Sequence, residues 1–362
     1  MKGLWKLVVA AALALAMMAS PVYASKIAIR VANAGPDKPD NRTVKAAKIF
    51  THTLNTLSGG EVEATFYHAS QLGSEQEALE GVQLGTIEMG TLSGGPVPSF
   101  FPEVMVYDIP YLFSSNAAAW EFFQSDFSKK LQDAFLKKTG VRILATTENG
   151  FRHFTNKKRQ IKSPEDLKGL KVRVMQNPAH MALVQAMGGD PTPIAFSELY
   201  MALQQGVVDA MECPIVLIHD MKFYEVQDQL VLDGHLYNPL FVFVNEAFYQ
   251  KLNNKQKKAL DEASHRFAMA HCGFNQESNS TALANLAKQG MNVYKPTPAE
   301  IAKFREVAQP AGLKFIREKI GDQWVDEALK AAAEAEAAVS GKEDAIVKET
   351  IAEANKALAE TK

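Results

Sequence analysis

The sequence predicts an α/β fold, because short segments with strand periodicity alternate with longer segments of helical periodicity along most of the chain. Glycines mark the ends of several of these segments, as at Gly59 and Gly60 and again at Gly188 and Gly189. The chain has 362 residues, a length that suits two domains of ordinary size. We therefore expect two α/β domains.

The first 24 residues are typical of a cleavable signal peptide. Lys2 and Lys6 precede an apolar run over residues 7–19, and Val22 and Ala24 occupy the −3 and −1 positions of a cleavage site before Ser25. The apolar run is shorter than the roughly 20 residues that cross a bilayer. No cysteine follows it that could carry a lipid anchor. The sequence therefore predicts export to a bacterial periplasm.

Charge and cysteine content narrow the possible partners of the mature chain. Removal of residues 1–24 would take away two lysines and no acids, which changes the formal net charge from −2 to −4. A mildly acidic chain is a poor match for nucleic acid, which requires a clustered basic face. No later run approaches the length of a membrane span, so we expect no direct membrane insertion. Cys213 and Cys272 are too few for a disulfide scaffold, and the sequence leaves open whether they pair.

In the first half of the mature chain, strand-like and helix-like segments follow one another. Strands are expected at residues 26–32, 62–67 and 87–92, and helices at residues 43–57 and 71–84, with a polar loop at 36–42. The third strand ends at Ser93, Gly94 and Gly95, where backbone amides can approach a ligand closely. Strand ends of this kind are where ligands bind in open α/β sheets.

The second half repeats the alternation. Strands are expected at residues 141–146, 170–175, 207–211 and 240–244. Ser163 and Pro164 start one helix, Asn177 and Pro178 start another, and residues 197–205 form a third. Residues 255–286 contain few helix breakers and predict a helix long enough to cross between two domains. The alanine-, glutamate- and lysine-rich residues after Asp322 predict a solvated helical tail.

Enzyme signatures are absent from the sequence. It has no nucleophile elbow, zinc-protease motif, dinucleotide fingerprint or phosphate loop, and its histidines are scattered. Cys213 is the one residue that suggests a nucleophile, but no histidine partner is recognisable, which favours a buried or pocket-lining thiol. We therefore expect a binding protein with no cofactor, no metal site and no catalytic residues.

Several residues between 148 and 214 suit the capture of a small anion. Arg173 stands between Val172 and Val174 in a predicted strand, where its side chain either faces solvent or meets an anion. Arg152 is open to the same two interpretations, and Phe196 taken alone would be a core residue. Taken alone, each of these residues has an ordinary structural explanation.

The order of the motifs resembles the DctP-like substrate-binding proteins of TRAP transporters, from about residue 26 to about residue 330. The segments that carry the resemblance are 166–174 (DLKGLKVRV), 191–200 (PTPIAFSELY) and 202–209 (ALQQGVVD), supported by 70–73, 109–111, 149–152 and 222–226. The resemblance implies a two-domain periplasmic binding protein with a hinge and a long domain-spanning helix. It places domain I at 25–149 and 238–277, domain II at 150–237 and 296–330, the bracing helix at 255–286 and a helical extension at 331–362.

The resemblance also implies a ligand site in the cleft between these domains. Arg173 corresponds to the family's main carboxylate-binding arginine, Arg152 to a frequent second arginine, and Phe196 to an aromatic wall. The family's usual Glu-Asn-Pro is Glu212, Cys213 and Pro214 here, so an amide side chain is replaced by a thiol. The remaining residues expected at the cleft are Asn33, Glu75, Ser93 and Gln176, or Asn177 if the register shifts by one residue.

The function that follows is capture of an organic acid and its delivery to the membrane subunits of a TRAP permease. An arginine fork can hold both oxygens of a carboxylate and keeps its charge at any working pH. The sequence leaves three alternatives open: a receptor of an ATP-driven importer, a ligand sensor that docks on a signalling receptor, and a periplasmic hydrolase that uses Cys213. It does not identify the acid.

Overall fold

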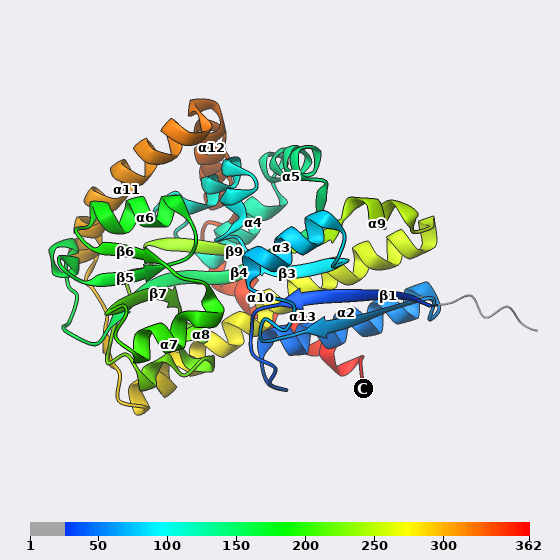
Figure 1. The fold of residues 1–362 in the computed structure, drawn as a ribbon, viewed down its shortest axis with the longest axis horizontal. Helices are drawn as coiled ribbons and strands as arrows, with labels where there is room; N and C mark the ends of the chain where they lie inside the picture. The colour runs from blue at the N-terminus through cyan, green and yellow to red at the C-terminus, as the bar shows by residue number, and fades with distance from the viewer. Residues whose placement is uncertain (1–25) are drawn as a thin grey trace, which may run out of the picture.

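The computed structural model describes residues 26–362, so the expected signal peptide and its cleavage site lie outside the described residues. Helices cover both faces of one long sheet (Figure 1), which confirms the α/β class. The strands are β1 (Ile27–Asn33), β2 (Val62–Tyr67), β3 (Met89–Ser93), β4 (Val141–Asn156), β5 (Lys171–Val174), β6 (Asp190–Pro193), β7 (Ala210–Pro214), β8 (Gln229–Val231), β9 (Leu236–Asn245) and β10 (Asn292–Tyr294).

Helices connect these strands and extend beyond the last of them. The α-helices are α2 (Arg42–Ser58), α3 (Glu75–Leu84), α4 (Asn116–Gln124), α5 (Asp126–Thr139), α6 (Pro178–Ala186), α7 (Leu199–Gln204), α8 (Ile215–Asp220), α9 (Glu246–Lys251), α10 (Asn254–Lys288), α11 (Pro298–Ile320), α12 (Asp322–Val339) and α13 (Glu343–Ala359). Short 3₁₀ helices occupy Val97–Ser99, Pro102–Asp108, Pro164–Leu167, Phe196–Glu198 and Phe223–Glu225. Among residues 26–362, none of the helices has the length and apolar character of a membrane span.

The strand order divides the sheet into two halves. It runs β2-β1-β3-β9-β4-β7-β5-β6, with β8 paired to β4 and to β10. The β2-β1-β3 pairs and the β7-β5-β6 pairs are parallel, whereas β9 and β4 pair with their neighbours in antiparallel fashion. The two central strands therefore connect two parallel groups of three.

The central strands are longer than the sequence predicted, because strand β4 continues through residues that have turn character. Glu148, Asn149 and Gly150 form a register shift within β4, and Gly150 has φ 103°, which a residue with a side chain rarely adopts. This irregularity pairs with Asn238 and Pro239 of β9. It coincides with the boundaries that the sequence suggested for two domains, and we retain the division as a proposal.

Each half of the sheet has its own apolar core. On the β1 side, Phe50 of α2 and Phe267 of α10 pack against Val242 of β9. On the β5 side, Val172 packs with Phe304 of α11. These two clusters are separate, but a third cluster contains residues of both halves, including Ala32 of β1 and Ala179 of α6.

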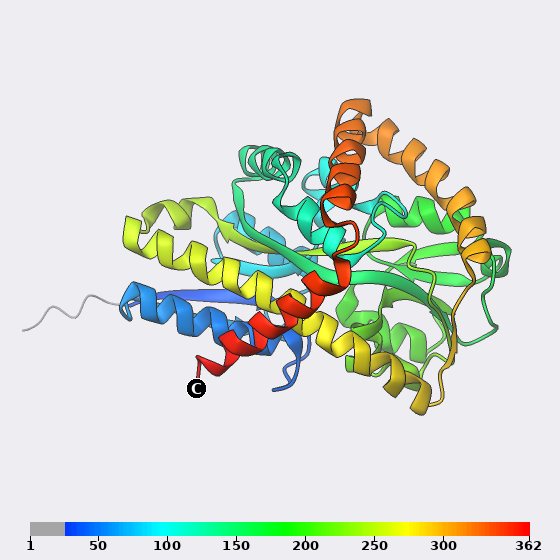
Figure 2. The same ribbon diagram turned by 180° about the vertical axis from the view of Figure 1, so that it is seen from behind.

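Helix α10 crosses behind both halves, as the sequence predicted. It spans 35 residues and contacts α2 and β4 at one end, and α8 towards the other. Figure 2, the view from the opposite side to Figure 1, shows α10 in front of the sheet with α13 lying across it. Gly273 is the point of closest approach, because a Cβ atom there would lie 2.5 Å from the Thr350 carbonyl oxygen of α13. The C-terminal tail is therefore helical and packed, rather than only solvated.

Some elements differ from the sequence prediction. Strand β7 begins at Ala210 rather than at residue 207, and α3 begins at Glu75 rather than at residue 71, because Ser74 caps it in a capping box with Glu77. Strand β6 was not predicted, because it contains Pro191 and Pro193. It lies at the edge of the sheet, where a missing N–H is tolerated.

Candidate functional site

A cavity lies between the two halves of the sheet, where strand ends and helix starts converge. Its empty volume is about 540 Å³, part of it continuous with solvent. The residues that line it are Asn33, Ala34, Gly35, Pro36, Asn41, Arg42, Thr43, Glu75, Thr91, Ser93, Asn149, Arg152, Arg173, Met175, Phe196, Cys213, Leu217 and Leu240. Seven of the ten residues that the sequence suggested are among them.

Arg173 reaches this cavity because of strand alternation. Val172 and Val174 of β5 point into the apolar core, so Arg173 between them points to the other face. Its side chain is 2% exposed, and its Nε and Nη2 atoms donate to the Ile194 carbonyl oxygen at 2.9 and 2.7 Å. Burial lowers the pKa of Arg173 to about 10, so the side chain stays charged at neutral pH. The solvated interpretation of Arg173 is wrong.

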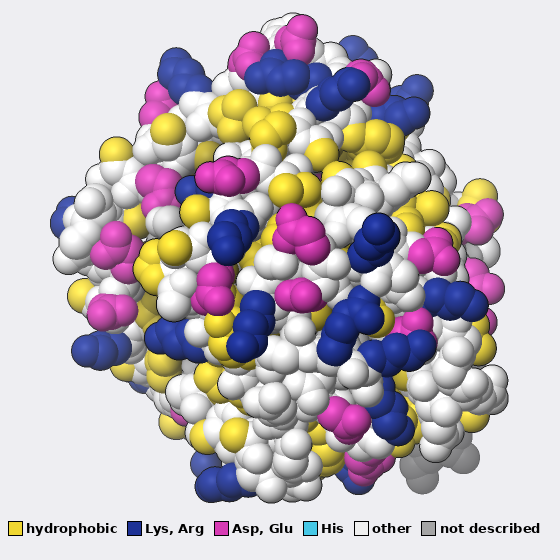
Figure 3. All heavy atoms as spheres, turned by 90° about the vertical axis from the view of Figure 1, so that its left-hand side faces the viewer, with side chains coloured by type: hydrophobic (Ala, Val, Ile, Leu, Met, Phe, Trp, Pro, Cys, Tyr) yellow, Lys and Arg dark blue, Asp and Glu magenta, His cyan; other side chains and the backbone are white. Residues whose placement is uncertain are grey.

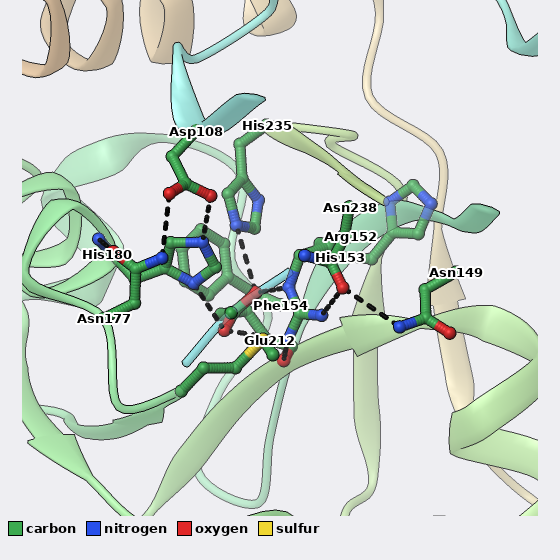
Figure 4. Close-up of polar contacts among 12 residues, drawn as sticks. Asp108, Asn149, Arg152, His153, Phe154, Asn177, His180, Glu212, His235 and Asn238 are labelled. Atoms are coloured by element: carbon green, nitrogen blue, oxygen red, sulfur yellow. Dashed lines mark hydrogen bonds and ion pairs between the residues drawn. The ribbon is translucent and has the colours of Figure 1, made fainter. Parts of the chain in front are cut away.

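Arg152 has a buried acidic partner (Figure 4). Its guanidinium forms an ion pair with Glu212, and Nη2 donates to Glu212 Oε1 at 2.9 Å and to the Glu212 carbonyl oxygen at 2.7 Å. Burial alone would raise the pKa of Glu212, but Arg152, His180 and His235 together outweigh burial and hold the pKa well below the usual value. Glu212 therefore compensates Arg152 from behind the cavity.

Two histidines flank Glu212. His180 Nδ1 lies 3.6 Å from Glu212 Oε1, and His235 Nε2 lies 3.8 Å from Glu212 Oε2. Their other ring nitrogens contact Asp108 at 3.0 Å and Asp233 at 2.6 Å. Burial alone would lower both pKa values, but the carboxylates outweigh it together. Asp108 and Glu212 raise the pKa of His180, and Asp233 and Glu212 raise the pKa of His235 to about 9. Arg152 thus lies on a buried network of alternating charges.

Arg42 is a third arginine at the cavity, and the sequence analysis had assigned it to a loop. It is the first residue of α2, which Asn41 caps by accepting a hydrogen bond from the Thr43 backbone N–H. The Arg42 guanidinium donates to His271 Nε2, Asn275 Oδ1 and Asn149 Oδ1 at 3.3, 2.7 and 3.0 Å. The capping signal of Asn41 could have located the helix start, but nothing local indicated that Arg42 is buried.

The polar wall opposite Arg173 comes from the first half of the sheet. Asn33 ends β1, Ser93 ends β3 and Glu75 begins α3, so parallel strand ends bring them together. The Ser93 backbone N–H donates to Glu75 Oε1 at 2.8 Å, and Asn33 Nδ2 donates to Thr91 Oγ1 at 3.0 Å. Burial raises the pKa of Glu75, although Ser93 and Arg173 oppose the shift.

The remaining wall is apolar. Phe196 lies edge-on to Phe223, with ring centroids 6.1 Å apart, and Cys213 is buried on β7. Burial raises the pKa of Cys213 to about 11, so its thiol is protonated at neutral pH. Cys213 and Cys272 are both free. A protonated thiol is a poor nucleophile, which weighs against the hydrolase alternative.

Three of the suggested residues lie outside the cavity lining. Gln176 is exposed, because it follows the end of β5 and points away. Asn177 caps α6 and donates to Asp108 Oδ2 at 2.8 Å, so the shifted register does not place it in the cavity either. Glu212 is behind the lining because it pairs with Arg152. Within residues 26–362 no cluster of side chains has the composition of a metal site.

Most of this chain matches the model of one protein family. Residues 35–319 match the family described as bacterial extracellular solute-binding protein, family 7. A curated solute-binding protein of Verminephrobacter eiseniae is 39% identical over 271 residues, which are 75% of this chain and 80% of the relative.

Solved structures share the fold. A TRAP periplasmic solute-binding protein of Polaromonas, bound to D-erythronate, is 33% identical with a TM-score of 0.79, over 84% of this chain and 98% of that one. The sugar acid binding protein DctPAm of Advenella mimigardefordensis, in complex with galactonate, is 30% identical with a TM-score of 0.82, over 86% of this chain and 99% of that one.

Proposed function

We propose that this chain, which belongs to the bacterial extracellular solute-binding proteins of family 7, captures an organic acid between the halves of its sheet and delivers it to a TRAP permease. The observation that carries the proposal is Arg173, a buried guanidinium that lines the cavity and whose hydrogen bonds, among residues 26–362, all go to one backbone carbonyl. A buried charge without a counterion is costly, and a ligand carboxylate would remove that cost.

The neighbouring side chains fit an acid that also carries hydroxyl groups. Glu75 presents carboxyl oxygens that can accept a ligand O–H, and Asn33 and Ser93 add polar atoms on the same wall. Phe196 and Cys213 offer an apolar surface to the carbon skeleton. The relatives bound to D-erythronate and galactonate are consistent with such a ligand.

Closure of two domains is part of the proposal. A ligand that touches both halves of the sheet stabilises the state in which they are close, and the irregular pairing of β4 with β9 is the proposed hinge. Small-angle scattering should show a smaller radius of gyration with ligand than without it. An unchanged profile at saturation would contradict the clamp, once a closed ligand-free form has been excluded.

Export with cleavage before Ser25 is the expected route to the periplasm. The intact mass of the secreted protein should correspond to a chain that starts at or next to Ser25 without lipid. A retained apolar N-terminus would contradict this. The similarity to a solved TRAP periplasmic solute-binding protein favours a TRAP permease over an ATP-driven importer as the partner.

A thermal-shift screen tests the function directly. Sugar acids, hydroxy acids, dicarboxylates, keto acids and aromatic acids are added to the mature protein, and at 100 times its dissociation constant a ligand should stabilise the fold by about 2.7 kcal/mol. The same screen on Arg173→Ala is the control for binding at this site. If no acid stabilises the parent protein, the proposed function is wrong.

A further inference from the structure

Arg42 carries a buried charge that its contacts do not compensate. Its side chain is 3% exposed, and its three hydrogen-bond acceptors are a histidine ring and two amides. Burial lowers the pKa of His271 well below the usual value, so that ring is neutral. Within residues 26–362, Arg42 forms no ion pair within 4.0 Å, and the acids that raise its pKa, Asp220 and Glu148, act from beyond that distance.

The three cavity arginines therefore differ in charge balance. Arg152 has Glu212 at its side, and the pKa of Arg152 is raised even though burial opposes this. Among the described residues, Arg42 and Arg173 form no ion pair, and burial lowers both of their pKa values although more distant acids oppose the shift. A guanidinium has five N–H donors, and the three hydrogen bonds of Arg42 leave two of them without a partner among the described residues.

Arg42 and Arg173 belong to different halves of the molecule. Helix α2 packs against β2 and α10 on one side of the central strands, and β5 lies between β7 and β6 on the other (Figure 1). Both side chains line the same cavity. One ligand can therefore contact both arginines, with one anionic group for each half.

We propose that Arg42 is a specificity-determining residue that binds a second carboxylate of the ligand, so that the preferred ligand is a hydroxylated dicarboxylic acid. The inference rests on the proposed function, because Arg173 holds the first carboxylate. Glu75, the one acid among the lining residues, accepts hydrogen bonds from the hydroxyl groups between the two carboxylates. A monocarboxylic sugar acid would leave Arg42 buried without an anion.

Matched pairs of acids test the proposal by calorimetric titration of the mature protein. Galactarate and galactonate share a carbon chain and differ only at the terminal group, and so do meso-tartrate and D-erythronate. We expect the diacid to bind about 10- to 150-fold more tightly than its monoacid in the pair that fits the cavity, as for a charge-assisted hydrogen bond in place of a neutral one. Arg42→Gln should abolish this preference, because the amide keeps hydrogen bonding without the charge.

Arg30→Gln is the matched control, because Arg30 lies outside the cavity lining and pairs with Glu88 at the surface. It should keep the parent's preference for the diacid. Monoacids that bind as tightly as their diacids, or equal losses for both acids in Arg42→Gln, would overturn the inference and leave the proposed function intact. If Arg42→Gln does not fold, the ratio of diacid to monoacid affinity in the parent protein decides the question alone. Failure of every acid, in these pairs and in the wider screen, would overturn both.

Discussion

Arg152 on β4 and Glu212 on β7 form an ion pair that is almost completely excluded from solvent, with side-chain exposures of 3% and 1%. The strands are antiparallel, and Glu212 lies directly opposite Phe154, two residues along from Arg152. The two side chains are therefore diagonal neighbours across the sheet, within reach of long side chains. The main role of Arg152 is therefore to stabilise the fold through this ion pair. Arg173 lines the cavity and, among the described residues, forms no ion pair.

Removal of Arg152 should therefore reduce the stability of the fold. Arg152→Ala leaves Glu212 buried without its main counterion, which should cost about 3–5 kcal/mol of unfolding free energy. The double variant Arg152→Met with Glu212→Met should recover much of that loss, because neither charge is then buried alone. Urea unfolding of the three proteins is the measurement. A double variant as unstable as Arg152→Ala would contradict this account.

Arg173 should affect ligand affinity far more than folding. Arg173→Ala leaves the ligand carboxylate desolvated without its partner, which should cost about 3–5 kcal/mol, or roughly 150- to 5,000-fold in affinity. Arg173→Lys should recover only part, because the charge returns without the planar fork. Titration calorimetry with melting curves measures both effects. A folded Arg173→Ala that binds within about threefold of the parent would remove Arg173 from the site.

Gly95 and Met175 meet across the two halves of the molecule. A Cβ atom at Gly95 would lie 1.9 Å from Met175 Cε, so Gly95→Ala forces Met175 to move. We expect weaker ligand binding by about 1–3 kcal/mol, typical of overpacking, and restoration by a second change, Met175→Ala. The melting temperature of the ligand-free protein should change little if this contact forms on closure. An equal loss of stability without ligand would show a permanent packing contact instead.

The buried histidine network predicts lower stability in alkaline solution. The pKa of His235 is about 9 in the folded protein, because Asp233 and Glu212 outweigh the effect of burial, and it is about 6.5 in an unfolded chain. A raised pKa contributes stability that is fully present below pH 6.5 and lost as the pH rises through 9. The free energy of unfolding should therefore fall over this window, by at most about 1.4 kcal/mol per pH unit for one proton.

The variant His235→Gln should flatten part of this dependence, and the rest should come from His180, whose pKa is also raised. His52→Gln is a suitable control, because His52 is exposed on α2. Urea unfolding between pH 6 and 9.5 would measure the slopes. Identical slopes in the parent and in His235→Gln would contradict the proposed protonation of His235.

One end of the molecule has a surface of mixed charge. Figure 3 shows the end of the molecule on the left of Figure 1, where lysine and arginine side chains are intermixed with aspartate and glutamate. No single sign of charge dominates this face.

The local sequence pattern was sufficient to predict those helices and strands whose formation depends on residues close in sequence. Strand alternation around Val172 and Val174 and the unbroken helical pattern after Lys255 led to β5 and α10. Ser93 was expected at a ligand site because strand ends of a parallel sheet meet at one edge, and Asn33 from the family resemblance; both line the cavity. The order of the motifs then indicated Arg173 and the binding function.

Only the tertiary structure decided which arginines are free to bind. Arg42 takes its burial from His271 and Asn275, which lie 229 and 233 positions away on α10. Glu212 leaves the cavity because Arg152, 60 positions away, holds it on the adjacent strand. Hydrophobic periodicity and capping motifs predict only the local environment of a residue, within its own helix or strand and the next. The compensation of a buried charge depends on partners brought together by folding, and no local pattern in the sequence records them.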